Sequence, residues 1–342
     1  MVGLEPVKRP KNGLIVFPKV LGGHLHSHTD GKIVKYATDY PLANCIGIIR
    51  IGNLFLSIIN FQSVSLYFCA KFQSMRLGSI LVAVILLFNS CSINNFSIDN
   101  DLKQYFDKYK ATGSFALFDN AQAEFTIYDS ANFRKRFTPA STFKIVNSLI
   151  GLETGKIFDE KMIIKWDGEV RSREELNKDM TMEEAFKVSS VPYYQEVARR
   201  IGRDTMQQWI DTLQYGNKNT SGAIDSFWLN NTIKISPDEQ LGLVKRLYFE
   251  QLPFQKRTQQ IVRKVMMQED NSLYKLAYKT GWGFDEKGEN IGWIVGWIEE
   301  NRHPYFFVLL VQSPDEKYDM RKNRLDLLKD ILKHYDFMQG KK

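Results

Sequence analysis

Ser141 and Lys144 are the residues of this chain whose types and spacing best suit covalent chemistry. Pro139 and Ala140 precede the pair, and the apolar positions of residues 145–152 predict an amphipathic helix directly after it. Residues three apart are neighbours on a helix surface, so the hydroxyl and the amine are expected on one face. An unprotonated lysine can take the proton of a serine hydroxyl, which makes Ser141 a candidate nucleophile and Lys144 its base.

The same S-x-x-K spacing recurs at Ser272 and Lys275. That copy leads into a predicted strand, where positions three apart point to opposite faces, so we interpret it as a coincidence of sequence. The helix expected after Ser141 would instead direct free N–H groups and partial positive charge towards an acyl oxyanion. The tetrapeptide alone is a weak signal, and further motifs have to support it.

A second motif, Lys279-Thr280-Gly281, lies at the end of a predicted strand. Its ammonium and hydroxyl groups could hold a substrate carboxylate, and Gly281 would let a ligand lie against the strand backbone. Alone, the tripeptide could equally be an exposed turn. Together with an upstream S-x-x-K, it resembles the signature of the penicillin-recognising serine enzymes.

Residues 100–340 resemble the class D β-lactamases, the oxacillinase family, in the order of five motifs. These motifs are Ser141 with Lys144, Ser189 with Val191, Tyr215-Gly216-Asn217, Trp228, and Lys279-Thr280-Gly281. A class A enzyme would carry S-D-N where this chain has Ser189-Ser190-Val191. The resemblance implies a β-lactamase/transpeptidase-like fold and the hydrolysis of β-lactam antibiotics, with resistance as its consequence.

The resemblance also implies a mechanism. Ser141 would be acylated, and Lys144, carboxylated by CO2 to N6-carboxylysine, would be the general base for acylation and deacylation. Burial beside apolar groups such as Val191 would keep the amine neutral, as carboxylation requires. Trp228 would donate its indole N–H to the carbamate, and Ser189 would pass a proton to the leaving lactam nitrogen. No metal and no cofactor other than CO2 is implied.

Substrate binding follows from the same resemblance. The backbone N–H groups of Ser141 and Trp282 would form the oxyanion hole. The drug carboxylate would be held by Lys279, Thr280, Gly281 and Arg321. Each assignment has a structural alternative: Trp228 as ordinary core, Arg321 as a solvated helix charge, and Tyr215-Gly216-Asn217 as a helix-ending turn. Leu176 stands where many relatives carry tryptophan, which predicts a different entrance to the site.

These motifs require a scaffold of strands at both ends of the domain around a helical middle. Strands are expected at 114–119 and 123–128, joined as a hairpin, and again at 274–280, 292–298 and 305–312. Helices are expected at 102–109, within 182–213 with a break at 188–192, at 236–249 and at 321–337. Residues 92–100 are expected to be a tether, and much of 163–178 a surface loop. This order predicts an α+β fold, an antiparallel sheet flanked by helices with a helical subdomain.

The net charge of +7 comes from the N-terminal part of the 342-residue chain. Residues 1–90 carry nine Lys and Arg against three Asp and Glu, which leaves 37 against 36 for residues 91–342. A nearly neutral domain gives no indication of a nucleic-acid partner. After Cys91 the chain has no cysteine, and His303 and His334 are its only histidines there, which disfavours thiol, zinc and Ser-His-Asp chemistry.

Residues 75–91 have the order of a bacterial export signal: Met75-Arg76, an apolar stretch, and a cysteine at the junction. We therefore expect export to the periplasm and lipidation of Cys91, which would anchor the protein to a membrane. Plain signal-peptidase cleavage and an uncleaved anchor are the alternatives. Residues 1–74 are interpreted as an upstream extension outside the fold, and 92–342 as the catalytic domain. A metal site made by the histidines at 24, 26 and 28 is disfavoured, because no second ligands follow.

Two other functions were weighed against hydrolysis. One is a β-lactam sensor domain, acylated without fast turnover, which in signalling receptors follows several membrane spans and a protease-like domain. The other is a cell-wall transpeptidase, for which the chain has no length left for a second module.

Overall fold

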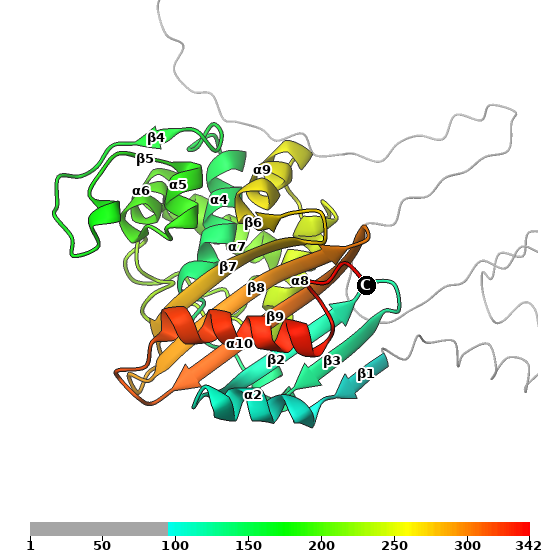
Figure 1. Ribbon diagram of the computed structural model, residues 1–342. Helices are drawn as coiled ribbons and strands as arrows, with labels where there is room; N and C mark the ends of the chain where they lie inside the picture. The colour runs from blue at the N-terminus through cyan, green and yellow to red at the C-terminus, as the bar shows by residue number, and fades with distance from the viewer. Residues whose placement is uncertain (1–94) are drawn as a thin grey trace, which may run out of the picture. The chain divides into compact units, whose positions relative to one another are not determined.

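The computed structural model describes residues 95–342, and these form a sheet with helices on both faces (Figure 1). The sheet has seven strands in the order β1-β3-β2-β9-β8-β7-β6. The strands are β1 Asn95–Ile98, β2 Thr112–Asp119, β3 Glu124–Tyr128, β6 Met267–Asp270, β7 Lys275–Phe284, β8 Asn290–Glu300 and β9 His303–Ser313. All neighbouring strands are antiparallel except β1 and β3. The predicted α+β class is confirmed, with one parallel pair added to the sheet.

The centre of the sheet is buried on both faces, and its sequence shows why. Strands β8 and β9 are nearly continuous apolar runs, as expected for strands covered on two sides. Along β9, Phe307 and Leu309 belong to one apolar cluster, while Phe306 and Val308 belong to the other. This alternation divides the core into two layers, one on each face of the sheet.

Helices α2, Lys103–Lys108, and α10, Met320–His334, cover one face of the sheet (Figure 1). The other face is covered by α4 Lys144–Glu153, α8 Pro237–Tyr248 and α9 Lys256–Met266. Beyond α4 lies the helical subdomain, made of α5 Met182–Lys187, α6 Val191–Ile201 and α7 Arg203–Leu213. The remaining short elements are η1 Asn100–Leu102, α3 Ser130–Arg134, η2 Ala140–Phe143, η3 Glu174–Leu176, β4 Ile163–Ile164 and β5 Met180–Thr181.

Helices α5 and α8 each begin with a capping box. The N–H of Glu184 donates to Thr181 Oγ1 at 3.2 Å, and the N–H of Thr181 donates to Glu184 Oε2 at 2.8 Å. Ser236 and Glu239 exchange the same two bonds at 3.2 and 2.8 Å. These bonds satisfy backbone donors that the first turn of a helix leaves free, and they fix where α5 and α8 begin.

The structure adds elements to the expected scaffold in three places. Residues 92–100 are not simply a tether, because Asn95–Ile98 pair with β3 as a parallel edge strand and η1 follows. Residues 163–178 are not all loop, since β4 pairs with β5 and η3 lies between them. Helix α9 was not expected at all; it buries Thr258 and Gln259 on its inner face, so its apolar stripe is interrupted.

The expected leader at 75–91, with Cys91, and the extension at 1–74 lie outside the described residues. Within 95–342, no helix combines the length and the apolar character that crossing a membrane requires.

Candidate active site

Ser141 and Lys144 meet at the start of the central helix. The chain enters through the 3-10 turn η2, which contains Ser141, and Lys144 is the first residue of α4. The Lys144 Nζ donates to Ser141 Oγ at 2.7 Å. Ser141 is 9% exposed and Lys144 is fully buried, so the hydroxyl faces the pocket with the amine behind it. This is the contact that proton transfer from a serine nucleophile requires.

The surroundings of Lys144 favour its neutral form. Burial, aided by the positive charge of Arg173, lowers the pKa of the Lys144 amine from its usual 10.5 to about 7. The ring of Tyr194 lies 5.6 Å from Nζ. A substantial fraction of the amine is therefore unprotonated near neutral pH, the state in which it can accept a proton or react with CO2.

Trp228 lies in the core directly behind this pair. Its ring stacks on Phe143, the residue before Lys144, with the centroids 5.3 Å apart. The indole is fully buried, and Nε1 has no hydrogen-bond partner among residues 95–342. A buried donor without an acceptor is costly, so this N–H is suited to an anionic group at the end of the Lys144 side chain. The residues present therefore fit a carboxylated Lys144.

Lys279 connects the other two motifs. Its Nζ donates to Ser189 Oγ at 2.9 Å and to the carbonyl of Thr280 at 3.0 Å. Burial, together with the positive charges of Lys144, Arg324 and Arg173, holds the pKa of the Lys279 amine well below its usual value. An anion bound here would reverse that effect, because it would favour the charged ammonium.

Ser189 occupies the turn between α5 and α6 in a left-handed conformation, with φ of 56°. Such a backbone is uncommon for serine and persists only where its surroundings fix it. The guanidinium of Arg173 donates to the carbonyl of Val188 at 2.7 Å, and Ser190 caps α6 with a 3.4 Å bond from the N–H of Tyr193. These hydrogen bonds hold the turn in place, with the Ser189 hydroxyl next to the Lys279 amine.

Gly281 packs against the turn that carries the nucleophile. A Cβ at this position would lie 2.9 Å from the carbonyl oxygen of Pro139 and 3.2 Å from Thr142 Cγ2. The missing side chain thus lets strand β7 approach the Ser141 turn. This differs from the expectation that it makes room for a ligand, because the space above Gly281 is filled by protein.

Replacing Gly281 by alanine is expected to lower both stability and activity. The new methyl group has to move the backbone of the Pro139 turn, which should cost about 1–3 kcal/mol and displace Ser141 from its partners. Melting temperature and the rate of acylation by a penicillin measure the two effects. Gly242→Ala on α8, where the added Cβ meets nothing within 4 Å, is the matched control and should leave both unchanged or improve stability. A Gly281→Ala protein that matches this control would show that the contact is unimportant.

The pocket has a volume of about 400 Å³ and contains most of the residues that the sequence singled out. Its lining includes Ser141, Ser189, Val191, Lys279, Thr280, Trp282 and Arg321. Trp282 is 40% exposed, and its indole donates to Asn290 Oδ1 at 2.9 Å. Ser141, as an early residue of η2, has one of the N–H groups that a helix start leaves free. Lys144 and Trp228 are buried in the core and do not line the pocket. The structure thus brings the S-x-x-K, Ser189 and Lys279-Thr280 motifs to one pocket, while Tyr215-Gly216-Asn217 does not line it.

Sequence reasoning missed two basic residues of this pocket, Arg324 and Arg173. Arg324 is 7% exposed, and its guanidinium donates to the carbonyl of Gly281. A signal was available for it: Arg324 falls on the same stripe of α10 as Met320 and Leu328, which face the core. Arg321, the residue that was chosen, lies on the exposed side of that helix.

Tyr215-Gly216-Asn217 forms a turn after α7. Gly216 is left-handed, with φ of 53°, and a Cβ there would lie 1.9 Å from the carbonyl oxygen of Lys234. Asn217 Oδ1 accepts the N–H of Lys234 at 3.0 Å. These contacts favour the structural alternative for this motif, which fastens the turn beneath the site.

The comparisons with known proteins agree with this geometry. A family model described as the penicillin binding protein transpeptidase domain matches residues 105–333. "Probable beta-lactamase YbxI" of Bacillus subtilis is 40% identical over 230 residues, covering 67% of this chain and 83% of the relative. A solved class D β-lactamase of Sebaldella termitidis has a TM-score of 0.68 at 33% identity, covering 72% of this chain and 100% of that one. The chain belongs to the class D β-lactamases.

A receptor domain shares the same fold. The C-terminal domain of the BlaR penicillin receptor of Bacillus licheniformis has a TM-score of 0.67 at 27% identity, covering 71% of this chain and 97% of that one. The family predicted from the five motifs is therefore confirmed, and the sensor is a neighbour in fold at lower identity.

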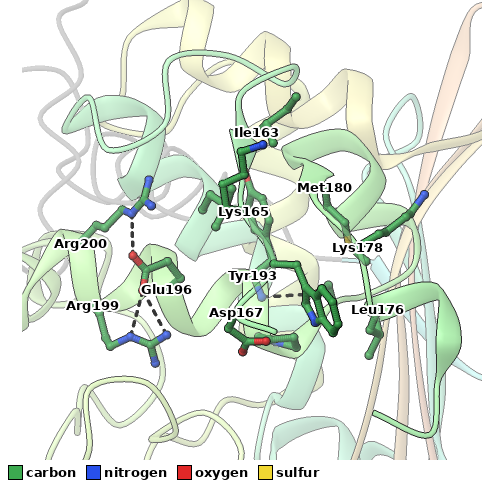
Figure 2. A pocket seen from close by; sticks show the side chains of 14 residues that line it. Ile163, Lys165, Asp167, Leu176, Lys178, Met180, Tyr193, Glu196, Arg199 and Arg200 are labelled. Atoms are coloured by element: carbon green, nitrogen blue, oxygen red, sulfur yellow. Dashed lines mark hydrogen bonds and ion pairs between the residues drawn. The ribbon is translucent and has the colours of Figure 1, made fainter. Parts of the chain in front are cut away.

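A second cavity, of about 320 Å³, lies beside the active site of this class D β-lactamase (Figure 2). Leu176 lines this cavity and not the active-site pocket. Glu196 accepts hydrogen bonds from Arg199 and Arg200 at its edge. The charged side chains that line this cavity thus each have an oppositely charged partner, either within the lining or next to it.

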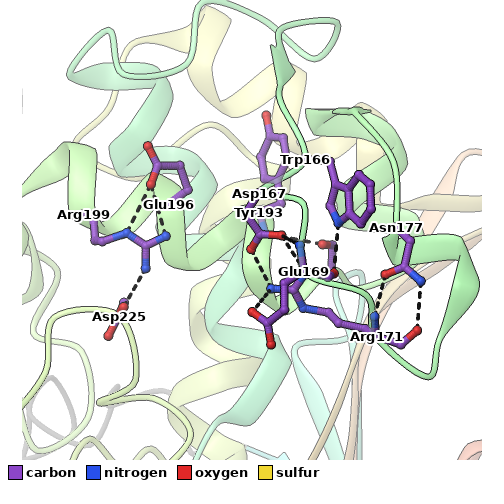
Figure 3. A network of polar contacts seen from close by, with 10 residues as sticks. Trp166, Asp167, Glu169, Arg171, Asn177, Tyr193, Glu196, Arg199 and Asp225 are labelled. Atoms are coloured by element: carbon purple, nitrogen blue, oxygen red, sulfur yellow. Dashed lines mark hydrogen bonds and ion pairs between the residues drawn. The ribbon is translucent and has the colours of Figure 1, made fainter.

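The loop at residues 166–177 is held by the polar network shown in Figure 3. Arg171 binds both carboxylate oxygens of Asp167, at 2.8 and 2.6 Å, and this bond lowers the pKa of Asp167 to about 2. Asn177 closes the loop, because its side chain bonds the N–H and the carbonyl of Arg171 at 2.8 and 2.9 Å. The network holds this loop in place, and the loop positions Arg173 at the mouth of the active site.

Proposed function

We propose that this protein hydrolyses β-lactam antibiotics through an acyl-enzyme on Ser141 and thereby gives resistance to them. The observation that carries the proposal is the 2.7 Å contact between the Lys144 Nζ and Ser141 Oγ, in a buried setting that lowers the pKa of the amine to about 7. Lys144 takes the hydroxyl proton as Ser141 attacks the lactam carbonyl, and the same base then activates water to release the acid.

We further propose that Lys144 acts as its carbamate. Carboxylation by CO2 would convert the amine into an anionic base, and the cations nearby would stabilise this anion. Trp228 would donate its unpaired N–H to this group, and the burial of Lys144 would exclude water from it. Supporting this role are the lowered pKa of the amine and the absence of any other acceptor for Trp228 among residues 95–342.

The remaining pocket residues bind and orient the drug. The N–H groups of Ser141 and Trp282 stabilise the oxyanion, and Ser189, bonded to Lys279, passes the proton to the leaving nitrogen. Lys279, Thr280 and Arg321 hold the ring carboxylate, and Gly281 keeps their strand against the nucleophile.

Turnover of a chromogenic cephalosporin tests this function against the alternative of a β-lactam sensor. The expected result is many product molecules per protein, with a transient mass increase on Ser141 and none in Ser141→Ala. A single stoichiometric burst followed by a stable adduct would instead identify a sensor. That alternative is included because of the fold shared with the BlaR receptor domain.

We also propose export to the periplasm with a lipid anchor on Cys91, from the order of residues 75–91. Cys91→Ser is expected to move the processed protein from the membrane fraction to the soluble periplasmic fraction, while its specific activity stays the same. Fractionation with antibody detection measures this. A processed Cys91→Ser protein that remained in membranes would refute lipid anchoring, and loss of activity on deleting residues 1–74 would make them part of the enzyme.

A further inference from the structure

Arg173 connects the loop at residues 166–177 to the turn that carries Ser189. Its guanidinium donates to the carbonyl of Val188 at 2.7 Å, and its Nε donates to Glu175 Oε1 at 2.8 Å. Val188 directly precedes Ser189, so the bonded carbonyl belongs to the peptide group between these two residues. Because a peptide group is planar, any rotation of it changes the φ angle of Ser189. The bond from Arg173 therefore acts on the backbone that orients the Ser189 side chain.

The backbone at Ser189 depends on support from its surroundings. Its φ of 56° is left-handed, a conformation that a serine keeps only where the surrounding structure holds it. Within the turn, the N–H of Ser190 donates to the carbonyl of Ala185 at 2.8 Å. This local bond does not involve the carbonyl of Val188. Arg173 supplies the contact to that carbonyl from 15 residues earlier in the chain.

We propose that Arg173 is a positioning residue for acylation, because it holds Ser189 where its hydroxyl can protonate the leaving lactam nitrogen. This inference rests on the proposed function. As the lactam C–N bond breaks, its electron pair goes to the nitrogen, which takes the hydroxyl proton of Ser189. Ser189 takes a proton from the ammonium form of Lys279, whose Nζ donates to Ser189 Oγ at 2.9 Å. The proton that Lys144 took from Ser141 balances this loss, and exchange with solvent restores both lysines.

Hydrolysis of the acyl-enzyme makes a different demand on the site. The lactam nitrogen is already protonated, and Lys144 activates the attacking water, so Ser189 protonates no leaving amine in this step. Loss of the Arg173 contact should therefore slow acylation and leave deacylation unchanged. A residue that only stabilised the pocket would affect both steps.

The positive charge of Arg173 has a second effect, which the experiment has to separate from the first. It helps to lower the pKa of the Lys144 amine to about 7. That amine also interacts with the hydroxyl of Ser141, the ring of Tyr194 and the cation of Lys279. Removing the charge of Arg173 should raise this pKa, so that less of the amine is neutral near pH 7 and both steps slow. Kinetics at about pH 8.5 with added bicarbonate, where the amine is mostly neutral in either protein, isolate the effect on the turn.

Arg173→Met is the main test, with benzylpenicillin as the drug. Its acylation rate constant, measured by rapid quench and mass spectrometry of the intact protein, should fall about tenfold or more, the loss expected for a charge-assisted hydrogen bond. Its deacylation rate constant should stay within about twofold of the wild type. An unchanged acylation rate constant, or an equal fall in both constants, would overturn the inference.

Arg200→Met is the matched control. It removes the same charge from a residue outside the active-site pocket, where Arg200 pairs with Glu196 at 2.8 Å. Both of its rate constants should stay within about twofold of the wild type.

A second substrate tests the assigned proton transfer and covers the case in which Arg173→Met fails to fold. The 4-nitrophenyl ester of phenylacetylglycine releases an anion that needs no proton, so its acylation rate should not depend on Arg173. The ratio of the acylation rate for benzylpenicillin to that for the ester should fall in Arg173→Met. It should fall less in Arg173→Lys, which keeps the charge and one donor. An unchanged ratio in whichever variant folds would refute the inference, whereas a wild type that does not hydrolyse benzylpenicillin would refute the proposed function.

Discussion

Lys144→Ala is expected to lower kcat for a penicillin by about 10³- to 10⁴-fold, which is what a positioned general base contributes. The rate of deacylation should fall more than the rate of acylation. The water molecule depends on a general base more strongly than does a serine hydroxyl at the start of a helix. The acylated form should therefore accumulate on Ser141 and be visible by mass spectrometry of the intact protein. Folding should survive, since the change removes a buried amine whose only hydrogen-bond partner among residues 95–342 is Ser141.

Lys322→Ala is the control for this experiment. It deletes an exposed lysine that pairs with Asp326 one helical turn away, and both kcat and the melting temperature should stay close to the wild type. Turnover by Lys144→Ala within tenfold of the wild type would show that another group acts as the base.

Trp228→Phe should have the second largest effect, a loss of about 10- to 100-fold in kcat/KM at ambient CO2. The phenyl ring keeps most of the apolar volume that stacks on Phe143, but it lacks the indole N–H, which has no acceptor among residues 95–342. Losing that donor destabilises an anion on Lys144 without deleting the amine. Added bicarbonate should therefore restore part of the activity of Trp228→Phe, and none of that of Lys144→Ala.

Trp209→Phe provides the matched control, because this partly buried tryptophan stacks on Phe254, with centroids 4.5 Å apart, away from the pocket. Its kinetics should not respond to bicarbonate. Trp228→Phe activity that is independent of bicarbonate would assign Trp228 to the core alone, the alternative that its sequence also allowed.

The sequence predicted the parts of the site that depend on local spacing. Ser141 and Lys144 lie together because a helical turn joins them. Lys279 lies in the middle of β7, and its contact with Ser189 joins residues that are 90 positions apart. Arg321 was chosen by its position in the C-terminal helix. The apolar periodicity of α10 places position 324 towards the core, so this pattern indicates that Arg324 is the arginine that faces inward.

Other features of the fold and the site depend on contacts with residues outside the local segment, which no local sequence pattern predicts. Arg173 reaches the pocket only because the loop network around Arg171 and Asn177 holds it there. Helix α9 buries Gln259, whose amide bonds the carbonyls of Leu252 and Phe254, so a polar residue occupies an inner position. The parallel pairing of β1 likewise follows from a neighbouring strand and not from its own four residues.

Binding of ¹³C-labelled CO2 to Lys144, followed by NMR in the absence of drug, tests the central claim most directly. The carbamate forms only on the neutral amine, and the pKa of Lys144 is lowered to about 7. One carbamate signal per protein is predicted at pH 7.5; as the pH falls through 7 the amine takes up a proton, so the signal and the activity should fall together. The signal should be absent from Lys144→Ala. A fully active wild type without any such signal at pH 7.5 would contradict the account and leave the uncarboxylated Lys144 as the base.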